Sequence, residues 1–225
     1  PWSDLILAHY PFDGSLEDVS GHENHAQLLA VDSHSVGDID DVVSYELGQG
    51  GIGKAVQLSG IDGPALSIPE GAWLANRPTW MLAAWIKCTQ CNLFYVELSE
   101  LQQAQSRNLL RAGRPGLDNF FDNYPWQRVP KHPVHATMTG EMHPPPDDGG
   151  WHHIVWVRDH SYLRFYIDGV FAAWEHFEPY QGETITVAML GGALGDSDPS
   201  ASFVGAVDSL NLLQSTCAPS DHSPP

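Results

Sequence analysis

Oxygen-bearing side chains crowd the segment from Asp13 to Asn24, which reads DGSLEDVSGHEN. Carboxylate and amide oxygens are ligands of Ca²⁺, which takes about six to eight oxygens at once. The same residue types cap turns through their own backbone amides, so a purely structural interpretation also fits. The residues of this segment that we expect to bind a calcium ion are Asp13, Asp18, Ser20 and Asn24.

A second group of candidate binding residues lies in residues 113–128, where aromatic rings are interleaved with planar polar side chains. An aromatic ring can stack on the C–H face of a sugar while amide and guanidinium groups bind its hydroxyls. The alternative is that a long loop needs an aromatic cluster of its own to stay ordered. If a glycan binds, we expect the stacking platforms to be Tyr124 and Trp126, and the polar partners to be Arg114, Asn119, Asn123 and Arg128.

The three cysteines are Cys88, Cys91 and Cys217. Cys88 and Cys91 form a C-x-x-C motif, but no second such motif and no βαβ pattern accompanies it, which argues against a redox or zinc site. A local disulfide between Cys88 and Cys91, or two unpaired thiols, fits the sequence better. Cys217 would then be free or paired with another chain.

The sequence contains no arrangement typical of catalysis. His132, His135 and His143 share one segment, but their spacing matches no zinc enzyme. Glycoside hydrolysis needs two carboxylates roughly 5–10 Å apart, and no stretch here carries acids alternating along a strand. A G-x-S-x-G elbow and a phosphate-binding loop are also missing from the sequence. We therefore predict that the protein is not an enzyme.

The elements that position these residues are predicted most clearly in residues 151–174. Residues 151–158 are mostly bulky and apolar on both alternating faces, which is typical of a strand covered on both faces or carrying a ligand-facing surface. Of its two histidines, we expect His153 to be the inner, hydrogen-bonded one. Asp168-Gly169 indicates a two-residue hairpin, because both positions of such a turn need a positive φ. The pattern predicts three consecutive antiparallel strands.

Residues 80–87, WMLAAWIK, predict another strand that is apolar on both faces. Trp80 and Trp85 fall on opposite faces of it, because side chains alternate along a strand. We expect one of the two rings in the core and the other either in the core or lining a concave surface.

Four segments together resemble one family: HYPFDGSLEDVSGHENHA, GKAVQLSG, WHHIVWVRD…LRFYIDG and FVGAVDSLNLL. They are similar to the laminin-G-like, concanavalin A-type jelly rolls. The resemblance implies an all-β fold, a two-sheet antiparallel β-sandwich. It also implies that calcium ties the first loop to the last strand, where the matching residue is Asp208. Members of this superfamily bind sugars or proteins, cleave glycans or hold larger proteins together, so the resemblance fixes the fold better than the function.

The middle of the chain departs from the family pattern at about residues 97–150. Within it, residues 97–111 have a helical composition, although residues 109–111 fit a strand equally well. We expect one jelly-roll domain over residues 1–217 with this loop-rich insertion, and a Pro/Ser-rich tail or linker over residues 218–225.

Composition narrows the choice of partners. The 225-residue chain has 28 acidic and 10 basic residues, a net charge of −18, which argues against nucleic acid and anionic membranes. No apolar run approaches the ~20 residues that cross a bilayer. We expect a secreted or cell-surface protein and a non-catalytic carbohydrate-binding or adhesive module stabilised by Ca²⁺. The alternative is a structural subunit of a surface filament or multidomain scaffold, in which the same loops contact other protein modules.

Overall fold

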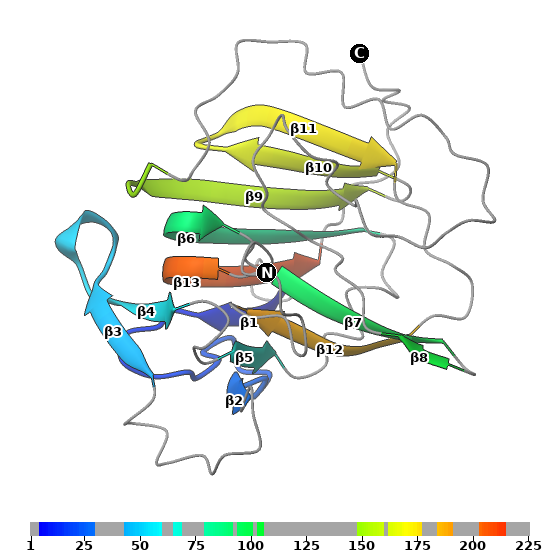
Figure 1. The fold of residues 1–225 in the computed structure, drawn as a ribbon, viewed down its shortest axis with the longest axis horizontal. Helices are drawn as coiled ribbons and strands as arrows, with labels where there is room; N and C mark the ends of the chain where they lie inside the picture. The colour runs from blue at the N-terminus through cyan, green and yellow to red at the C-terminus, as the bar shows by residue number, and fades with distance from the viewer. Residues whose placement is uncertain are drawn as a thin grey trace.

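The computed structural model describes residues 5–29, 43–59, 65–68, 79–91, 94–100, 103–105, 148–159, 162–176, 184–190 and 203–214. These residues form two β-sheets in which every strand pair is antiparallel (Figure 1). The two-sheet all-β fold predicted from the sequence is therefore confirmed.

The larger sheet has eight strands. Their order is β11 (Val170–His176), β10 (Tyr162–Ile167), β9 (Trp151–Asp159), β6 (Thr79–Cys91), β13 (Phe203–Gln214), β4 (Lys54–Ser59) and β3 (Ser44–Leu47), with β1 (Ile6–Tyr10) paired to β13. The smaller sheet has five, in the order β2 (Gln27–Leu29), β5 (Ala65–Ile68), β12 (Thr184–Leu190), β7 (Phe94–Glu100) and β8 (Gln103–Gln105). The last strand, β13, thus lies inside the larger sheet between strands from much earlier in the chain.

One hydrophobic core joins the two sheets. On β9, Ile154 and Trp156 are buried while the residues between them are half-buried, as the period-two alternation of a strand requires. Leu66 and Ile68 of β5 belong to the same core cluster, so the smaller sheet packs against this face of the larger one. Trp80 of β6 also lies in the core and is 4% exposed. We call the opposite face of the larger sheet its outer face.

The three-stranded meander β9–β10–β11 is confirmed. The turn between β10 and β11 contains Asp168 at φ 51° and Gly169 at φ 78°. Two consecutive positive φ values match the right-handed twist of the flanking strands, which is why a short Asp-Gly sequence is found here.

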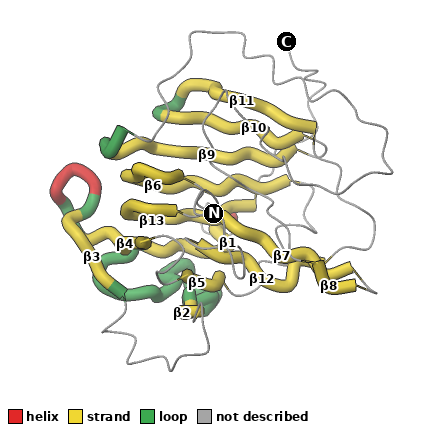
Figure 2. Tube along the Cα trace, in the orientation of Figure 1, coloured by secondary structure: helices red, strands yellow, loops and turns green. Residues whose placement is uncertain are grey.

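The helix expected over residues 97–111 is wrong where the structure describes it. Residues 94–100 form β7, which pairs along β12, and residues 103–105 form β8. Backbone pairing with a distant strand overrode the local helical composition, since strand preference depends on tertiary context. In the described ranges the structure contains no α-helix, and a short 3₁₀ turn at Gln49–Gly51 caps the β3–β4 hairpin (Figure 2). The described ranges therefore hold no helix that is long and apolar enough to cross a membrane.

Candidate functional site

Aromatic rings line the outer face where β6 and β9 run side by side. Trp85 and His153 face each other in register, with 5.1 Å between their ring centroids. The next pair is Lys87 and Trp151, where the Lys87 Nζ lies 5.5 Å from the centre of the Trp151 ring. These side chains are half-buried, so each ring is fixed by its neighbours while part of its surface stays accessible.

Polar groups continue this arrangement across the sheet to the edge strand β3. The Lys87 ammonium pairs with the carboxylate of Glu46. The Gln57 Nε2 donates to Glu46 Oε2 at 2.9 Å, and the Ser44 Oγ donates to Gln57 Oε1 at 3.1 Å. We define the outer-face patch as Trp85, Trp151, His153, Lys87, Glu46 and Gln57.

The outer-face patch offers binding chemistry of a particular kind. Its aromatic rings are partly accessible, and its amide, ammonium and carboxylate groups are held in place by one another. Glu46 is engaged by both Lys87 and Gln57, which fixes the position of its carboxylate. Fixed planar groups beside aromatic rings suit a ligand with C–H faces and hydroxyl edges.

Asp18 organises the first loop through its carboxylate. Oδ1 accepts hydrogen bonds from the backbone N–H groups of His9 (2.8 Å) and Ser20 (2.9 Å). Oδ2 accepts from the Ser20 hydroxyl (2.8 Å) and the Asn24 backbone N–H (3.0 Å). Burial opposes ionisation, but these hydrogen bonds outweigh it and hold the pKa of Asp18 below its usual range. The four acceptor positions of this carboxylate are thus occupied by the protein itself.

The side chains of Asp13, in the first loop, and Asp208, in β13, instead contact the turn that joins β3 to β4. Asp13 Oδ1 accepts from the Lys54 backbone N–H at 2.8 Å, and Asp208 Oδ2 accepts from the Gln49 backbone N–H at 2.9 Å. A side chain at Gly48 would come within 2.9 Å of Asp208 Oδ2 and 3.3 Å of the Lys54 carbonyl oxygen. Glycine at position 48 therefore permits carboxylate and carbonyl oxygens to approach this turn closely.

The predicted calcium ligands therefore divide into two groups. Asp18, Ser20 and Asn24 bind one another in the first loop, whereas Asp13 and Asp208 both bind the Gly48–Lys54 turn. Within the described ranges no cluster of three or more His, Cys, Asp or Glu side chains is placed to hold a metal ion. Calcium binding stays a prediction. The Gly48–Lys54 turn was not predicted, although the Gly50-Gly51 pair is a turn signal that could have located it.

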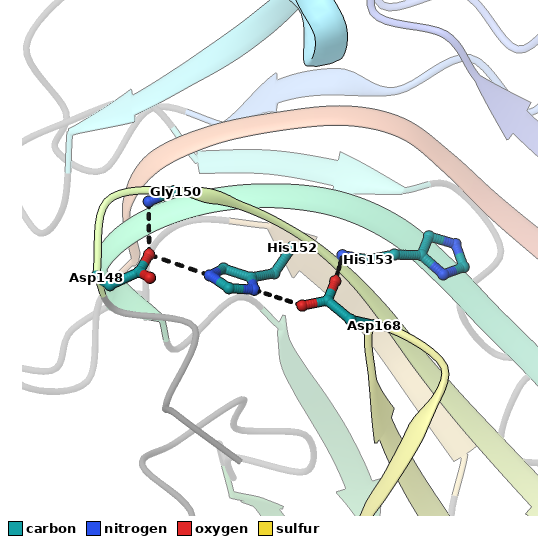
Figure 3. A network of polar contacts seen from close by, with 5 residues as sticks. All are labelled: Asp148, Gly150, His152, His153 and Asp168. Atoms are coloured by element: carbon teal, nitrogen blue, oxygen red, sulfur yellow. Dashed lines mark hydrogen bonds and ion pairs between the residues drawn. The ribbon is translucent and has the colours of Figure 1, made fainter.

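His152 is buried between two carboxylates (Figure 3). Its Nδ1 lies 2.7 Å from Asp168 Oδ2 and its Nε2 lies 3.0 Å from Asp148 Oδ1. Burial of the ring disfavours its charged form, but the hydrogen bonds to Asp168 and Asp148 outweigh this and raise the pKa of His152. The expectation for His153 is wrong: His152 is the inner histidine, and His153 faces outward against Trp85.

Comparison with known families agrees with this architecture. The Laminin_G_3 family, described as the concanavalin A-like lectin/glucanases superfamily, matches residues 63–221. The chain belongs to this superfamily. The family predicted from the sequence segments is therefore confirmed. The matched range includes residues 97–150, the segment that departs from the family pattern. No curated protein sequence matches the chain closely enough to count as a relative.

Several solved structures share this superfamily fold. Domain 4 of AbnA, a GH43 extracellular arabinanase from Geobacillus stearothermophilus in complex with arabinotriose, is 21% identical, covers 93% of this chain and 92% of its own, and has a TM-score of 0.57. The binding domain of Paraclostridial Mosquitocidal Protein 1 is 11% identical with a TM-score of 0.55, over 95% of this chain and 50% of its own. A botulinum neurotoxin type C structure, whose cell entry depends on two ganglioside molecules, is 12% identical with a TM-score of 0.51, over 94% and 48%. This chain thus spans about half the length of the toxin chains, and at these identities the likeness shows the fold.

Two further predictions from the sequence concern residues outside or at the margin of the described ranges. The predicted glycan-binding residues of the 113–128 segment lie outside the described residues: Arg114, Asn119, Asn123, Tyr124, Trp126 and Arg128. Cys88 is disulfide-bonded, which excludes a free thiol at this position. Its pairing with Cys91 stays a prediction, and Cys217 lies outside the described residues.

Proposed function

We propose that this domain is a non-catalytic carbohydrate-binding module of a secreted or cell-surface protein. The observation that carries the proposal is the outer-face patch, in which Trp85 and Trp151 stand beside a fixed Lys87–Glu46–Gln57 network. Superfamily relatives with sugar ligands lend support: domain 4 of the arabinanase binds arabinotriose, and a toxin relative interacts with gangliosides.

The patch favours a glycan for two reasons. Half-buried rings lose little conformational freedom on binding, because their neighbours already fix them. Glu46 Oε1 is buried against Lys87, but sugar hydroxyls can donate to Glu46 Oε2 or Gln57 Oε1 and accept from the Lys87 ammonium, so both donors and acceptors are present. Glu46 is the one carboxylate of the outer-face patch and pairs with Lys87, whereas glycoside hydrolysis requires two carboxyl groups flanking the scissile bond.

The 113–128 segment remains a second proposed contact, with Tyr124 and Trp126 as stacking platforms. If it contributes, substitutions there and in the outer-face patch will both weaken binding of the same glycan.

Calcium is the proposed stabilising cofactor, with a narrower set of ligands than the sequence alone suggests. Asp13 and Asp208 fit the role better, because each keeps acceptor positions beyond its hydrogen bond to the Gly48–Lys54 turn, even though Asp208 Oδ1 also accepts from the Ser209 hydroxyl at 2.9 Å. Asp18 fits poorly, since its carboxylate already accepts four hydrogen bonds. When bound, the ion would supply positive charge that holds the first loop, this turn and β13 together.

A glycan array tests the proposed function directly. The domain would be screened with and without Ca²⁺ against a set that includes arabinan oligosaccharides and ganglioside glycans. Binding to one structural class, lost in the Trp85→Ala variant, is the expected outcome. If the folded domain binds no glycan in either condition, the carbohydrate-binding proposal is wrong.

One observation favours the alternative of a structural subunit of a surface filament or multidomain scaffold. Val170 and Phe171 are 46% and 44% exposed on β11, the outermost strand of the larger sheet as described. An edge strand with apolar side chains can pair with another chain. Concentration-dependent association in light scattering, abolished by Phe171→Lys, would support this role.

A further inference from the structure

The protonation state of His152 decides how many contacts its ring can make. Both ring nitrogens lie within hydrogen-bond distance of a carboxylate oxygen, Asp168 on one side and Asp148 on the other (Figure 3). A carboxylate only accepts hydrogen bonds, so each nitrogen must carry a proton for both contacts to form. The geometry therefore corresponds to the imidazolium, whereas a neutral imidazole has one N–H and can satisfy one carboxylate.

The two carboxylates are held with unequal strength. Asp168 sits in the tight β10–β11 turn, and its Oδ1 also accepts the His153 backbone N–H at 2.8 Å. Its own backbone N–H donates to the His153 carbonyl at 2.8 Å. Asp148, by contrast, has a side chain that is 57% exposed, and its Oδ1 also accepts the Gly150 backbone N–H. A neutral His152 will therefore keep its bond to Asp168 and lose its bond to Asp148.

We propose that His152 is a proton-operated latch between the β10–β11 turn and the Asp148–Gly150 segment that leads into β9. With both ring nitrogens protonated the latch is closed. When the Nε2 proton leaves, the Nε2 lone pair faces the Asp148 carboxylate, and repulsion opens the segment while the β10–β11 turn stays bound.

Among the described residues, the charged side chains that contact the His152 ring are Asp148 and Asp168. On β6 the residue opposite His152 is Ile86, which is apolar and buried. Lys87 is next along β6 but lies on the outer face, paired with Glu46. On β9 itself, the buried Arg158 lies at the far end of the strand. The β10–β11 turn contributes Asp168, and the segment before β9 contributes Asp148.

The direction of the pH dependence follows from the raised pKa of His152. A histidine whose pKa is higher in the folded than in the unfolded state stabilises the fold when it is protonated. This contribution is complete at pH values below the unfolded-state pKa of about 6.5. That contribution is lost as the pH rises through the folded pKa. The latch is thus closed in mildly acidic solution and opens towards alkaline pH, without any requirement for a glycan ligand.

Two NMR measurements on the intact domain test the latch. Long-range ¹H–¹⁵N spectra of the imidazole should show His152 titrating with a midpoint above the ordinary value of about 6.5. Amide hydrogen exchange, corrected for the intrinsic pH dependence, should show Gly150 losing protection across that same midpoint while His153 keeps its protection. The contrast separates opening of the segment from unfolding of the hairpin.

Asp148→Asn is the diagnostic variant, because it keeps an acceptor oxygen but removes the charge. It should lower the titration midpoint of His152 and shift the loss of Gly150 protection to the same lower pH. Glu17→Gln is the matched control, since it removes one negative charge at an exposed position in the first loop and should shift neither. A His152 midpoint at or below the ordinary value, or a Gly150 protection that ignores the titration, would overturn the proposal.

Discussion

His152 and His153 are adjacent in the chain and yet meet opposite environments. Alternation along β9 turns His152 inward to Asp148 and Asp168, and turns His153 outward to Trp85. The sequence could not tell which was which, because bulky residues occupy both faces of this strand and period-two alternation does not say which face is the core. The residue that looked like an ordinary core histidine therefore belongs to the candidate binding surface.

Asp18 is a residue whose loss we expect to destabilise the fold, because its carboxylate accepts four hydrogen bonds. Asp18→Ala would leave the backbone N–H groups of His9, Ser20 and Asn24 without their acceptor, at a cost of about 1–3 kcal/mol in the free energy of unfolding. Because the pKa of Asp18 is lowered on folding, its contribution is present above about pH 3.8 and is lost as the pH falls through the folded pKa. Urea unfolding measured at neutral and at acidic pH checks both parts.

Glu17→Ala is the control for this variant, since Glu17 is the exposed neighbour of Asp18. It should change the free energy of unfolding little at either pH. An Asp18→Ala protein as stable as the wild type at neutral pH would contradict the role assigned to this carboxylate.

Trp85 is the residue on which the proposed glycan site depends most. Trp85→Ala should weaken binding of a glycan ligand by roughly 1–3 kcal/mol, the usual range for removing an aromatic anchor, which is about 5- to 150-fold in dissociation constant. Titration calorimetry measures the change, and Phe171→Ala, an exposed aromatic outside the outer-face patch, is the control. Equal affinity in Trp85→Ala would move the site to the 113–128 segment.

At the scale of elements, the strands with clear apolar patterns could be predicted from the sequence, but β7 and the grouping of the calcium ligands could not. Alternating or continuous apolar patterns predicted β6, β9 and β10, because burial enforces those patterns. In β7 the residues Phe94, Val96 and Leu98 also alternate with polar ones, but Glu97–Arg111 was interpreted by composition and a helix was expected. The two groups of predicted calcium ligands could not be separated either, since their hydrogen bonds depend on pairings between distant strands.

Gly205 marks a bulge at the centre of the larger sheet, where the register between β13 and β6 shifts. Its φ is 157°, and a Cβ there would lie within 2.7 Å of the Cys88 Cα and closer still to the Lys87 carbonyl oxygen. Because those atoms are backbone of a central strand, Gly205→Ala should destabilise the fold by about 1–3 kcal/mol, the typical cost of overpacking a core. Thermal unfolding provides the measurement.

Gly169→Ala provides the comparison, because Gly169 also has a positive φ, 78°, but no atom within 4 Å of its would-be Cβ. It should cost only the backbone strain of a non-glycine residue at that φ, about 1 kcal/mol. If the two variants are equally stable, the close approach of β6 and β13 does not explain why position 205 is a glycine.

At the scale of the whole molecule, the net charge of −18 makes the stability of the fold sensitive to bound cations. Excess negative charge keeps a protein soluble but destabilises its compact state through self-repulsion. A bound divalent cation offsets part of that repulsion where carboxylates gather. Calcium would therefore act on the fold as a whole, through the junction of the first loop, the Gly48–Lys54 turn and β13, although each contact there is local.

Calcium should raise the melting temperature of metal-stripped protein, because a ligand that binds only the folded state stabilises it by about 2.7 kcal/mol at one hundred times its dissociation constant. Asp208→Asn and Asp13→Asn should abolish the calcium response. Asp18→Asn should lower the melting temperature yet keep the response, because this carboxylate holds the loop through hydrogen bonds. Differential scanning calorimetry across a calcium titration separates the two groups. If Asp18→Asn also loses the calcium response, Asp18 is a calcium ligand after all. If the wild-type protein shows no response, the proposal that this domain binds calcium is wrong.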